Sequence, residues 1–319
     1  MTKETEIKVN KAIKKLHYIP NAAASRLGAG SLENIGVVFT CSAENAFQNP
    51  FFSEMLMGIG HVLEVYGYNM QLIMNNDIHV EREKVMSALA SGMIQGTILL
   101  STRKYDMLMQ DLAQHDYPFV VSGRVEGVVS DKLIYSVNTD NVGDGFRMVD
   151  HLAKLGHEKI AIILGPDEYV VNIDRYDGYR RALVNNGLAY DPDLEIQGGY
   201  TLADARKAVI QKMKDRPDIT AIFAKDDLKA IAAMQGVKEL GYEIPKDIAI
   251  VGINDYEIAM IAEPKLTTMH VPIYDLGAKA AEMLMKLIHN EEVEDNTQIL
   301  ETQMIIRQSC GANMKIKHL

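Results

Sequence analysis

Charged, amide and aromatic side chains follow the apolar runs of this 319-residue sequence at several points. Arginine and carboxylate groups bind paired hydroxyls through two hydrogen bonds, and an aromatic ring packs against the apolar face of a sugar. The residue types therefore predict a binding site for a small polyhydroxylated molecule. The candidates, most of which directly follow a predicted strand, are Phe51, Arg124, Arg175, Asp226, Asn254 and Asp255.

Structural roles are the alternative for several of these residues. For Phe51 the alternative is packing in the core, a role that we assign instead to the next residue. For Arg175 it is a surface ion pair with Asp174 or Asp177. Asp227 directly follows a candidate and is expected to cap the next helix, because aspartate is a preferred N-cap residue.

Motifs of several enzyme classes are absent from the sequence, among them G-x-S-x-G, the Walker loop, H-E-x-x-H and C-x-x-C. Gly58 and Gly60 lie inside a segment of helical periodicity, so they do not form a dinucleotide-binding turn. Cys41 and Cys310 are far apart and match no metal-ligand spacing. We therefore predict no enzyme activity, no catalytic residues, no metal ligands and no cofactor.

Length and composition indicate a globular protein with two subdomains, 47% hydrophobic and 24% charged. No apolar run is long enough to cross a membrane, and the first residues lack the apolar region of a secretory signal. We expect a cytoplasmic protein without membrane association. The net charge is −10, but residues 1–30 carry +4, so the rest carries −14. A basic arm attracts nucleic acid; the alternative is a solvated amphipathic helix.

Short runs rich in Val and Ile alternate with helical periodicity from Ile35 onward. The runs are apolar on both faces, so we expect each to be a parallel strand buried on both faces, in sheets covered by helices on both sides. Four such units precede Tyr135 and three follow Lys159. We therefore predict an α/β fold of two doubly wound parallel-sheet lobes with a cleft between them. The expected strands are 35–40, 69–74, 96–101, 118–123, 159–165, 220–225, 247–253 and 298–309, with a further extended segment over 266–272. The expected helices are 52–67, 81–92, 141–155, 173–186, 204–214, 227–240 and 273–289.

The predicted boundaries follow from this division. Residues 1–31 form an N-terminal segment, in which a helix ends near Pro20 and a very short helix follows over 21–27. Two turns of helix are not stable alone in water, so this segment should order only on binding a partner. Residues 32–136 with 271–297 are expected to form the N-terminal lobe, and 137–270 with 298–319 the C-terminal lobe.

Several motifs together resemble those of the lactose/galactose-repressor (LacI/GalR) family, and they occur in the family's order over nearly the whole chain. The segment from Leu16 to Leu27 resembles the junction between the last headpiece helix and the hinge helix, and the segment before Asn49 is similar to the maltose-operon branch. The other matching motifs are Asn49-Pro50-Phe51-Phe52, His151-Leu152-Ala153-Lys154-Leu155-Gly156-His157, Asp174-Arg175-Tyr176-Asp177-Gly178-Tyr179, Val251-Gly252-Ile253-Asn254-Asp255 and Leu266-Thr267-Thr268.

The resemblance implies the fold of periplasmic sugar-binding proteins, a homodimer, and paired hinge helices that enter the minor groove of operator DNA. It implies that Leu27 wedges into a base step, that Ala24 allows close approach to the groove floor, and that Tyr18, Asn21 and Arg26 hydrogen-bond the DNA. The alternative for this segment is a short linker whose leucine packs on the body. Family members begin with about two dozen further residues that form the helix-turn-helix, so we expect most of the headpiece to be missing here.

The resemblance also assigns cleft roles. It places Asn49 and Phe51 at the cleft, gives Arg175 the part of the arginine that clamps effector oxygens, and makes Asp226 a cleft-facing residue. The function that it implies is a transcription regulator, a repressor of maltose, α-glucoside or related genes, whose small carbohydrate effector controls the hinge. A phosphocarrier-protein corepressor is an implied further partner. The alternative is a sugar-binding receptor with no role at DNA.

Overall fold

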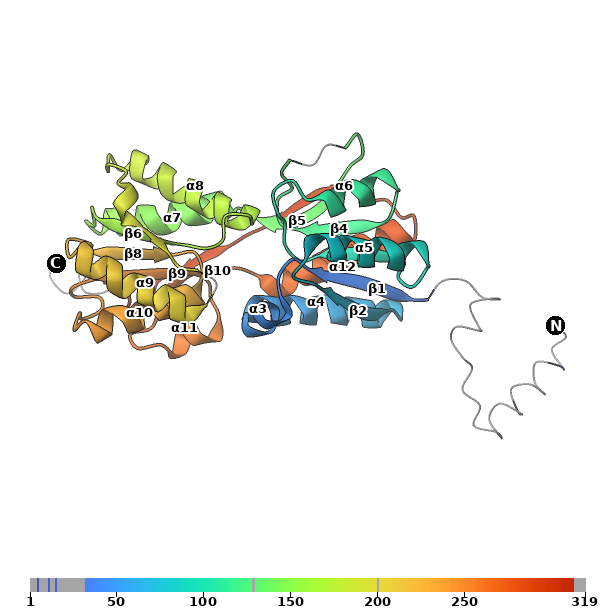
Figure 1. Ribbon diagram of the computed structural model, residues 1–319, viewed down its shortest axis with the longest axis horizontal. Helices are drawn as coiled ribbons and strands as arrows, with labels where there is room; N and C mark the ends of the chain where they lie inside the picture. The colour runs from blue at the N-terminus through green and yellow to red at the C-terminus, as the bar shows by residue number, and fades with distance from the viewer. Residues whose placement is uncertain are drawn as a thin grey trace.

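Two six-stranded sheets organise the chain. The computed structural model describes residues 32–127, 130–199 and 201–312, together with the single positions 5, 11 and 15. The sheets lie at opposite ends of the molecule's long axis, each between helices (Figure 1). This arrangement confirms the predicted α/β fold of two lobes. Within the described residues, no helix combines the length and apolar character that a membrane crossing requires.

The first sheet builds the N-terminal lobe. Its strand order is β11-β5-β4-β3-β1-β2, and every pairing is parallel. Its strands are β1 (Asn34–Phe39), β2 (Asn69–Met74), β3 (Gly96–Leu99), β4 (Phe119–Ser122), β5 (Tyr135–Thr139) and β11 (Thr297–Leu300). The helices α4 (Pro50–Tyr66) and α12 (Ile273–Ile288) pack on one face, and α5 (Ile78–Ala90) and α6 (Met107–Gln114) pack on the other, with the short α3 (Ala43–Gln48) before α4.

The second sheet builds the C-terminal lobe, in the order β12-β10-β9-β8-β6-β7. Its strands are β6 (Ile160–Leu164), β7 (Glu195–Gln197), β8 (Ala221–Ala224), β9 (Ala249–Asn254), β10 (Thr267–His270) and β12 (Gln303–Ile305). β12 is antiparallel to β10. The helices α7 (Asn141–Lys154) and α8 (Val170–Asn185) cover one face, and α9 (Leu202–Asp215) and α10 (Asp227–Glu239) cover the other; the short η1 (Pro192–Leu194) and α11 (Glu257–Ile261) complete the lobe.

The described chain crosses between the lobes after β5, after β10 and between β11 and β12 (Figure 1). The predicted boundaries at 136/137 and 297/298 differ from these crossings, because β5 and β11 both belong to the N-terminal sheet. The single strand predicted over 298–309 is wrong for the same reason. Its first part pairs with β5, and its second part pairs with β10 in the other lobe.

The prediction that 69–74 is buried on both faces is also wrong. β2 lies at the edge of its sheet and pairs only with β1, so part of its surface faces solvent; Leu72 is 39% exposed. Two strands lie outside the predicted set: β5, which begins at Tyr135, where the fourth predicted unit ends, and β7, which is only three residues long.

Helices α7 and α8 cross closely because glycines lie at their contact. A Cβ on Gly178 would lie 2.2 Å from the backbone oxygen of Val142, and a Cβ on Gly145 would lie 2.5 Å from the backbone oxygen of Arg175. Both separations are too short for any side chain. The two glycines therefore set how near the Arg175 backbone lies to α7.

Candidate functional site

A cavity of about 300 Å³ lies between the two lobes. Its walls include the carboxyl ends of strands in both sheets, where Thr102 and Arg124 follow β3 and β4, and Asp226 follows β8. Ligands of open α/β sheets bind at this edge, because the loops there converge on one point. Of the residues predicted for the cleft, those that line the cavity are Asn49, Phe51, Arg124, Arg175, Asp226 and Asn254.

The start of α4 brings an aromatic surface to the cavity. Asn49 caps the helix, and its Oδ1 accepts a hydrogen bond from the backbone nitrogen of Phe51 at 3.0 Å. The rings of Phe51 and Phe52 meet edge to face at 5.4 Å, and Phe52 also packs against the buried Phe39. Phe52 thus joins the cavity to the core, while Phe51 remains only partly buried.

Arg175 is buried in the cavity wall, at the start of α8. Its Nε donates to Oδ1 of Asn141 at 3.1 Å, one Nη donates to Oδ1 of Asn254 at 3.2 Å, and the other donates to the backbone oxygen of Lys225. All these acceptors belong to its own lobe, so the guanidinium is fixed whichever way the other lobe moves. Burial lowers the pKa of Arg175. The alternative of a surface ion pair is excluded by this burial.

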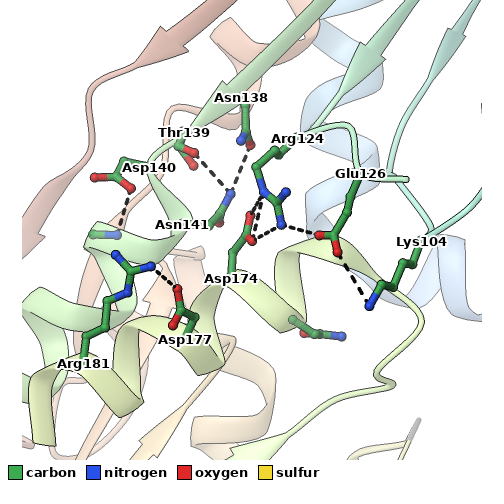
Figure 2. Close-up of polar contacts among 12 residues, drawn as sticks. Lys104, Arg124, Glu126, Asn138, Thr139, Asp140, Asn141, Asp174, Asp177 and Arg181 are labelled. Atoms are coloured by element: carbon green, nitrogen blue, oxygen red, sulfur yellow. Dashed lines mark hydrogen bonds and ion pairs between the residues drawn. The ribbon is translucent and has the colours of Figure 1, made fainter. Parts of the chain in front are cut away.

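An ion-pair chain joins the lobes along one side of the cavity (Figure 2). Arg124, in the N-terminal lobe, donates through Nε to both carboxylate oxygens of Asp174 in α8 at 3.1 Å and through Nη2 to Oδ1 at 2.6 Å. The same Nη2 donates to Glu126, which also faces Lys104 at 3.6 Å. The hydrogen bonds from Arg124 lower the pKa of Glu126, and Asp174 raises that of Arg124.

Neutral hydrogen bonds join the lobes elsewhere. Oη of Tyr256, in the C-terminal lobe, donates to Oδ1 of Asn49 at 2.9 Å. Nδ2 of Asn254 in turn donates to Oη of Tyr256 at 2.7 Å. Oη of Tyr169, which precedes α8, donates to the backbone oxygen of Thr40, directly after β1, at 2.7 Å. The structure therefore has the lobes in direct contact around the cavity.

The aspartates after β8 and β9 differ from prediction. Asp226 is the residue that caps α10, accepting from the backbone nitrogen of Lys229 at 2.8 Å, so the cap predicted for Asp227 is wrong. Asp227 is instead buried and accepts from Thr268 at 2.6 Å, and burial raises its pKa to about 7. Asp255 does not line the cavity.

The carboxylate of Asp255, whose backbone has a positive φ of 62°, is held by partners in its own lobe. It accepts from Arg307 at 2.6 Å and lies 3.2 Å from His270. His270 ends β10 and Arg307 follows β12, and the local sequence around Asp255 indicates neither contact. The hinge candidates Tyr18, Asn21, Ala24, Arg26 and Leu27 lie outside the described residues.

Several cavity residues were missed in the sequence. Lys225 directly follows β8, and Tyr256 lies two residues after Asn254, so their position after a strand was an available signal. Tyr169 and Asn172 lie farther from the end of β6, so their position in the sequence did not indicate that they line the cavity. The further polar residues that line the cavity include Thr40, Thr102, Asn138, Asn141, Tyr169, Asn172, Asp174 and Lys229.

Sequence and structure comparisons agree on the family. Residues 149–310 match the periplasmic binding protein-like domain. HTH-type transcriptional regulator CelR of Thermobifida fusca is 34% identical, with 94% of this chain and 88% of CelR covered. HTH-type transcriptional regulator MalR of Clostridium butyricum is 31% identical, with 96% of this chain and 90% of MalR covered.

Among solved structures, a complex of transcriptional regulator CelR with cellobiose superposes with a TM-score of 0.81 at 31% identity. It covers 97% of this chain and 91% of the CelR chain. The named relatives are regulators of transcription, which favours that function over a receptor with no role at DNA. The chain belongs to the LacI/GalR family of helix-turn-helix transcriptional regulators.

Proposed function

We propose that this regulator responds to a small carbohydrate, which binds in the cavity between the lobes. The observation that carries the proposal is one cavity lined by a fixed guanidinium, Arg175, an amide, Asn254, and a partly buried aromatic ring, Phe51. Bidentate donors and acceptors match paired sugar hydroxyls, and the ring matches an apolar sugar face. The cellobiose complex of CelR supports the same class of ligand here.

The effector acts by selecting one arrangement of the lobes. It contacts walls from both lobes, so its affinity differs between the arrangement seen here and one in which the lobes are apart. If DNA also favours one of the two arrangements, this difference in effector affinity couples the cavity to operator binding. A coupling of about 1–3 kcal/mol changes operator affinity about 5- to 150-fold.

The DNA partner is an operator, which paired N-terminal segments of a homodimer engage in the cytoplasm. In this proposal Leu27 wedges into a base step and Ala24 allows close approach, while Tyr18, Asn21 and Arg26 contact the duplex. A phosphocarrier protein is a further proposed corepressor. Effector binding alters how the lobes place the two segments. Their folding on DNA therefore becomes more or less favourable, and operator affinity changes with it.

Thermal shift and calorimetry with cellobiose, maltose, trehalose and sucrose test the cavity, because a ligand of the folded state raises Tm by mass action. An Asn254→Ala variant should lose most of that shift. Operator binding of the full chain, measured by gel shift over a range of salt, tests the DNA role, and Leu27→Ala should weaken it. The proposal would be refuted if neither the addition of sugar nor the Leu27→Ala substitution changed operator affinity.

A further inference from the structure

The charges around the cavity do not balance. Among the described residues, its lining contains four cations and two carboxylates, although the whole chain carries −10. Asp174 is paired with Arg124 at 2.6 Å, and Asp226 is paired with Lys229 at 3.1 Å. Both carboxylates are thus already neutralised by their own cations. The remaining cations of the lining are Arg175 and Lys225.

Lys225 is the less satisfied of these two. Arg175 uses its N–H groups on three oxygen acceptors, as described above. Lys225 is only 4% exposed, and its Nζ donates to a single acceptor, the backbone oxygen of Asn172, at 2.7 Å. The nearest aromatic ring, that of Tyr176, has its centroid 5.5 Å away. No carboxylate in the described chain lies within ion-pair distance of Nζ.

The surroundings of Lys225 make its charge costly. Removing an ammonium from water costs several kcal/mol unless a counter-ion compensates. Burial and the positive charge of Arg175 lower the pKa of Lys225 to about 7. The other charged groups that act on it are Lys229, which also lowers the pKa, and Glu195 and Asp167, which raise it. A neutral hydroxyl supplies no counter-charge, whereas a phosphate or carboxylate does.

We infer that the effector is a carbohydrate that carries an anionic group, a phosphate or a carboxylate, and that this group forms an ion pair with Lys225. The inference rests on the proposed function, because it names the class of sugar that the same cavity takes. Asn172, Asp226 and Lys229 line the cavity together with Lys225, and Asp226 is already paired with Lys229. An anion can therefore pair with the ammonium of Lys225 without displacing a carboxylate. The rest of the sugar lies toward Arg175 and Phe51.

Proton linkage gives this inference a specific signature. Near pH 8 the amine of Lys225 is mostly uncharged in the free protein, and an adjacent anion favours its ammonium form. Binding of an anionic sugar should therefore take up about one proton. Affinity should rise as pH falls from 8.5 to 7, a window in which sugar phosphates and sugar acids stay largely ionised. A neutral sugar should show neither effect.

Titration calorimetry on the full chain tests this with matched ligands: cellobiose, maltose and glucose as neutral sugars, their 6-phosphates, and cellobionate and glucuronate as sugar acids. We expect an anionic member to bind about 10- to 100-fold more tightly than its neutral parent. Runs at pH 8 in two buffers of different ionisation enthalpy measure the proton uptake. The phosphate and carboxylate arms separate the two sources of charge.

Lys225→Met keeps the length of the side chain and removes its charge, and Lys207→Met, at an exposed position on α9, is the control. Lys225→Met should remove the anion preference and the proton uptake, whereas Lys207→Met should keep both. An anion preference that survives Lys225→Met overturns the inference, as does equal binding of neutral and anionic sugars, which leaves the proposed function intact. If no sugar of either class binds, both proposals are wrong.

Discussion

The two walls of the cavity differ in chemistry. The wall from the N-terminal lobe is mostly neutral, with Asn49, Phe51 and Ser122, and its one charged residue, Arg124, is paired across the cleft. The wall from the C-terminal lobe holds the remaining charges: Asp174, Arg175, Lys225, Asp226 and Lys229. A preorganised charged wall orients a ligand, and a neutral aromatic wall adapts to its apolar face.

The walls also differ in what positions them. Arg175 is fixed by acceptors within its own lobe, so its geometry exists before the cleft closes. Asn49 and Arg124 have one partner each in their own lobe, but each also contacts the other lobe, and that contact depends on closure. If a ligand binds in the cavity, we therefore expect it to meet the C-terminal lobe first and the N-terminal lobe to respond by closing on it.

The largest effect should come from the charged wall. Arg175→Lys replaces a planar fork with a point charge, which cannot serve Asn141, Asn254 and a ligand together. Effector affinity measured by calorimetry should fall more than about 100-fold, because buried acceptors lose their donors. Phe51→Leu, on the neutral wall, should cost only about 10-fold, since most of the apolar area remains. Equal losses for both variants would remove the distinction between the walls.

The crossing of α7 and α8 should be the next most sensitive feature. Gly178→Ala places a Cβ 2.2 Å from the backbone oxygen of Val142, so the helices must separate, at a cost of about 1–3 kcal/mol. The shift also moves Arg175. Gly60→Ala in α4 is the matched control in the other lobe, since the nearest atom to its Cβ is Met70 Cε at 3.6 Å.

Gly60→Ala should instead stabilise the protein by about 0.5–1 kcal/mol, because alanine favours a helix interior. Urea denaturation measures both free energies of unfolding. Opposite signs for the two variants are expected, and a Gly178→Ala variant as stable as the parent protein would contradict the role given to this contact.

A buried carboxyl in each lobe gives a third contrast. Glu81, in the N-terminal lobe, is buried beside Arg103 at 3.1 Å. Asp227, in the C-terminal lobe, accepts from Thr268 and from the backbone nitrogen of Tyr256, and no cation of the described residues forms an ion pair with it. Burial raises the pKa of Asp227 from 3.8 to about 7. The folded state therefore holds the proton more tightly than the unfolded chain, and this contribution to stability is lost as pH rises from about 4 through 7.

Asp227→Asn should flatten that loss, which amounts to at most about 1.4 kcal/mol per pH unit. The Thr268 hydroxyl can turn to accept from the new amide, so the hydrogen bond is kept. Unfolding free energies at pH 5, 6, 7 and 8 give the slope for both proteins. If the slope of the variant matches that of the parent, another group titrates in this range.

The sequence predicted the fold best where strands are buried on both faces. β1, β8 and β9 are short, mostly apolar runs, and their length and composition identify them as buried strands. The prediction failed where one apolar pattern covers two short strands. β11 and β12 look like one strand in the sequence, and only their pairing partners, which lie far along the chain, separate them.

Cleft residues were predictable from their position after strands, but their hydrogen-bond partners were not. Asp255 meets Arg307 across 52 positions, which no local pattern encodes.

The smallest effect should come from the ion pair between the lobes. Arg124 is 43% exposed, so its pair with Asp174 is screened and contributes about 1 kcal/mol or less. Arg124→Gln should weaken effector binding about fivefold and favour separated lobes, visible as a larger radius of gyration in X-ray scattering. Because salt screens this pair, the difference in effector affinity between variant and parent should become smaller as the salt concentration rises.

Asn49→Ala is the matched control. It removes the neutral hydrogen bond to Tyr256, so its effect on effector affinity should not change with salt. If both variants showed the same salt dependence, the charged and the neutral contact could not be distinguished in their contribution to closure.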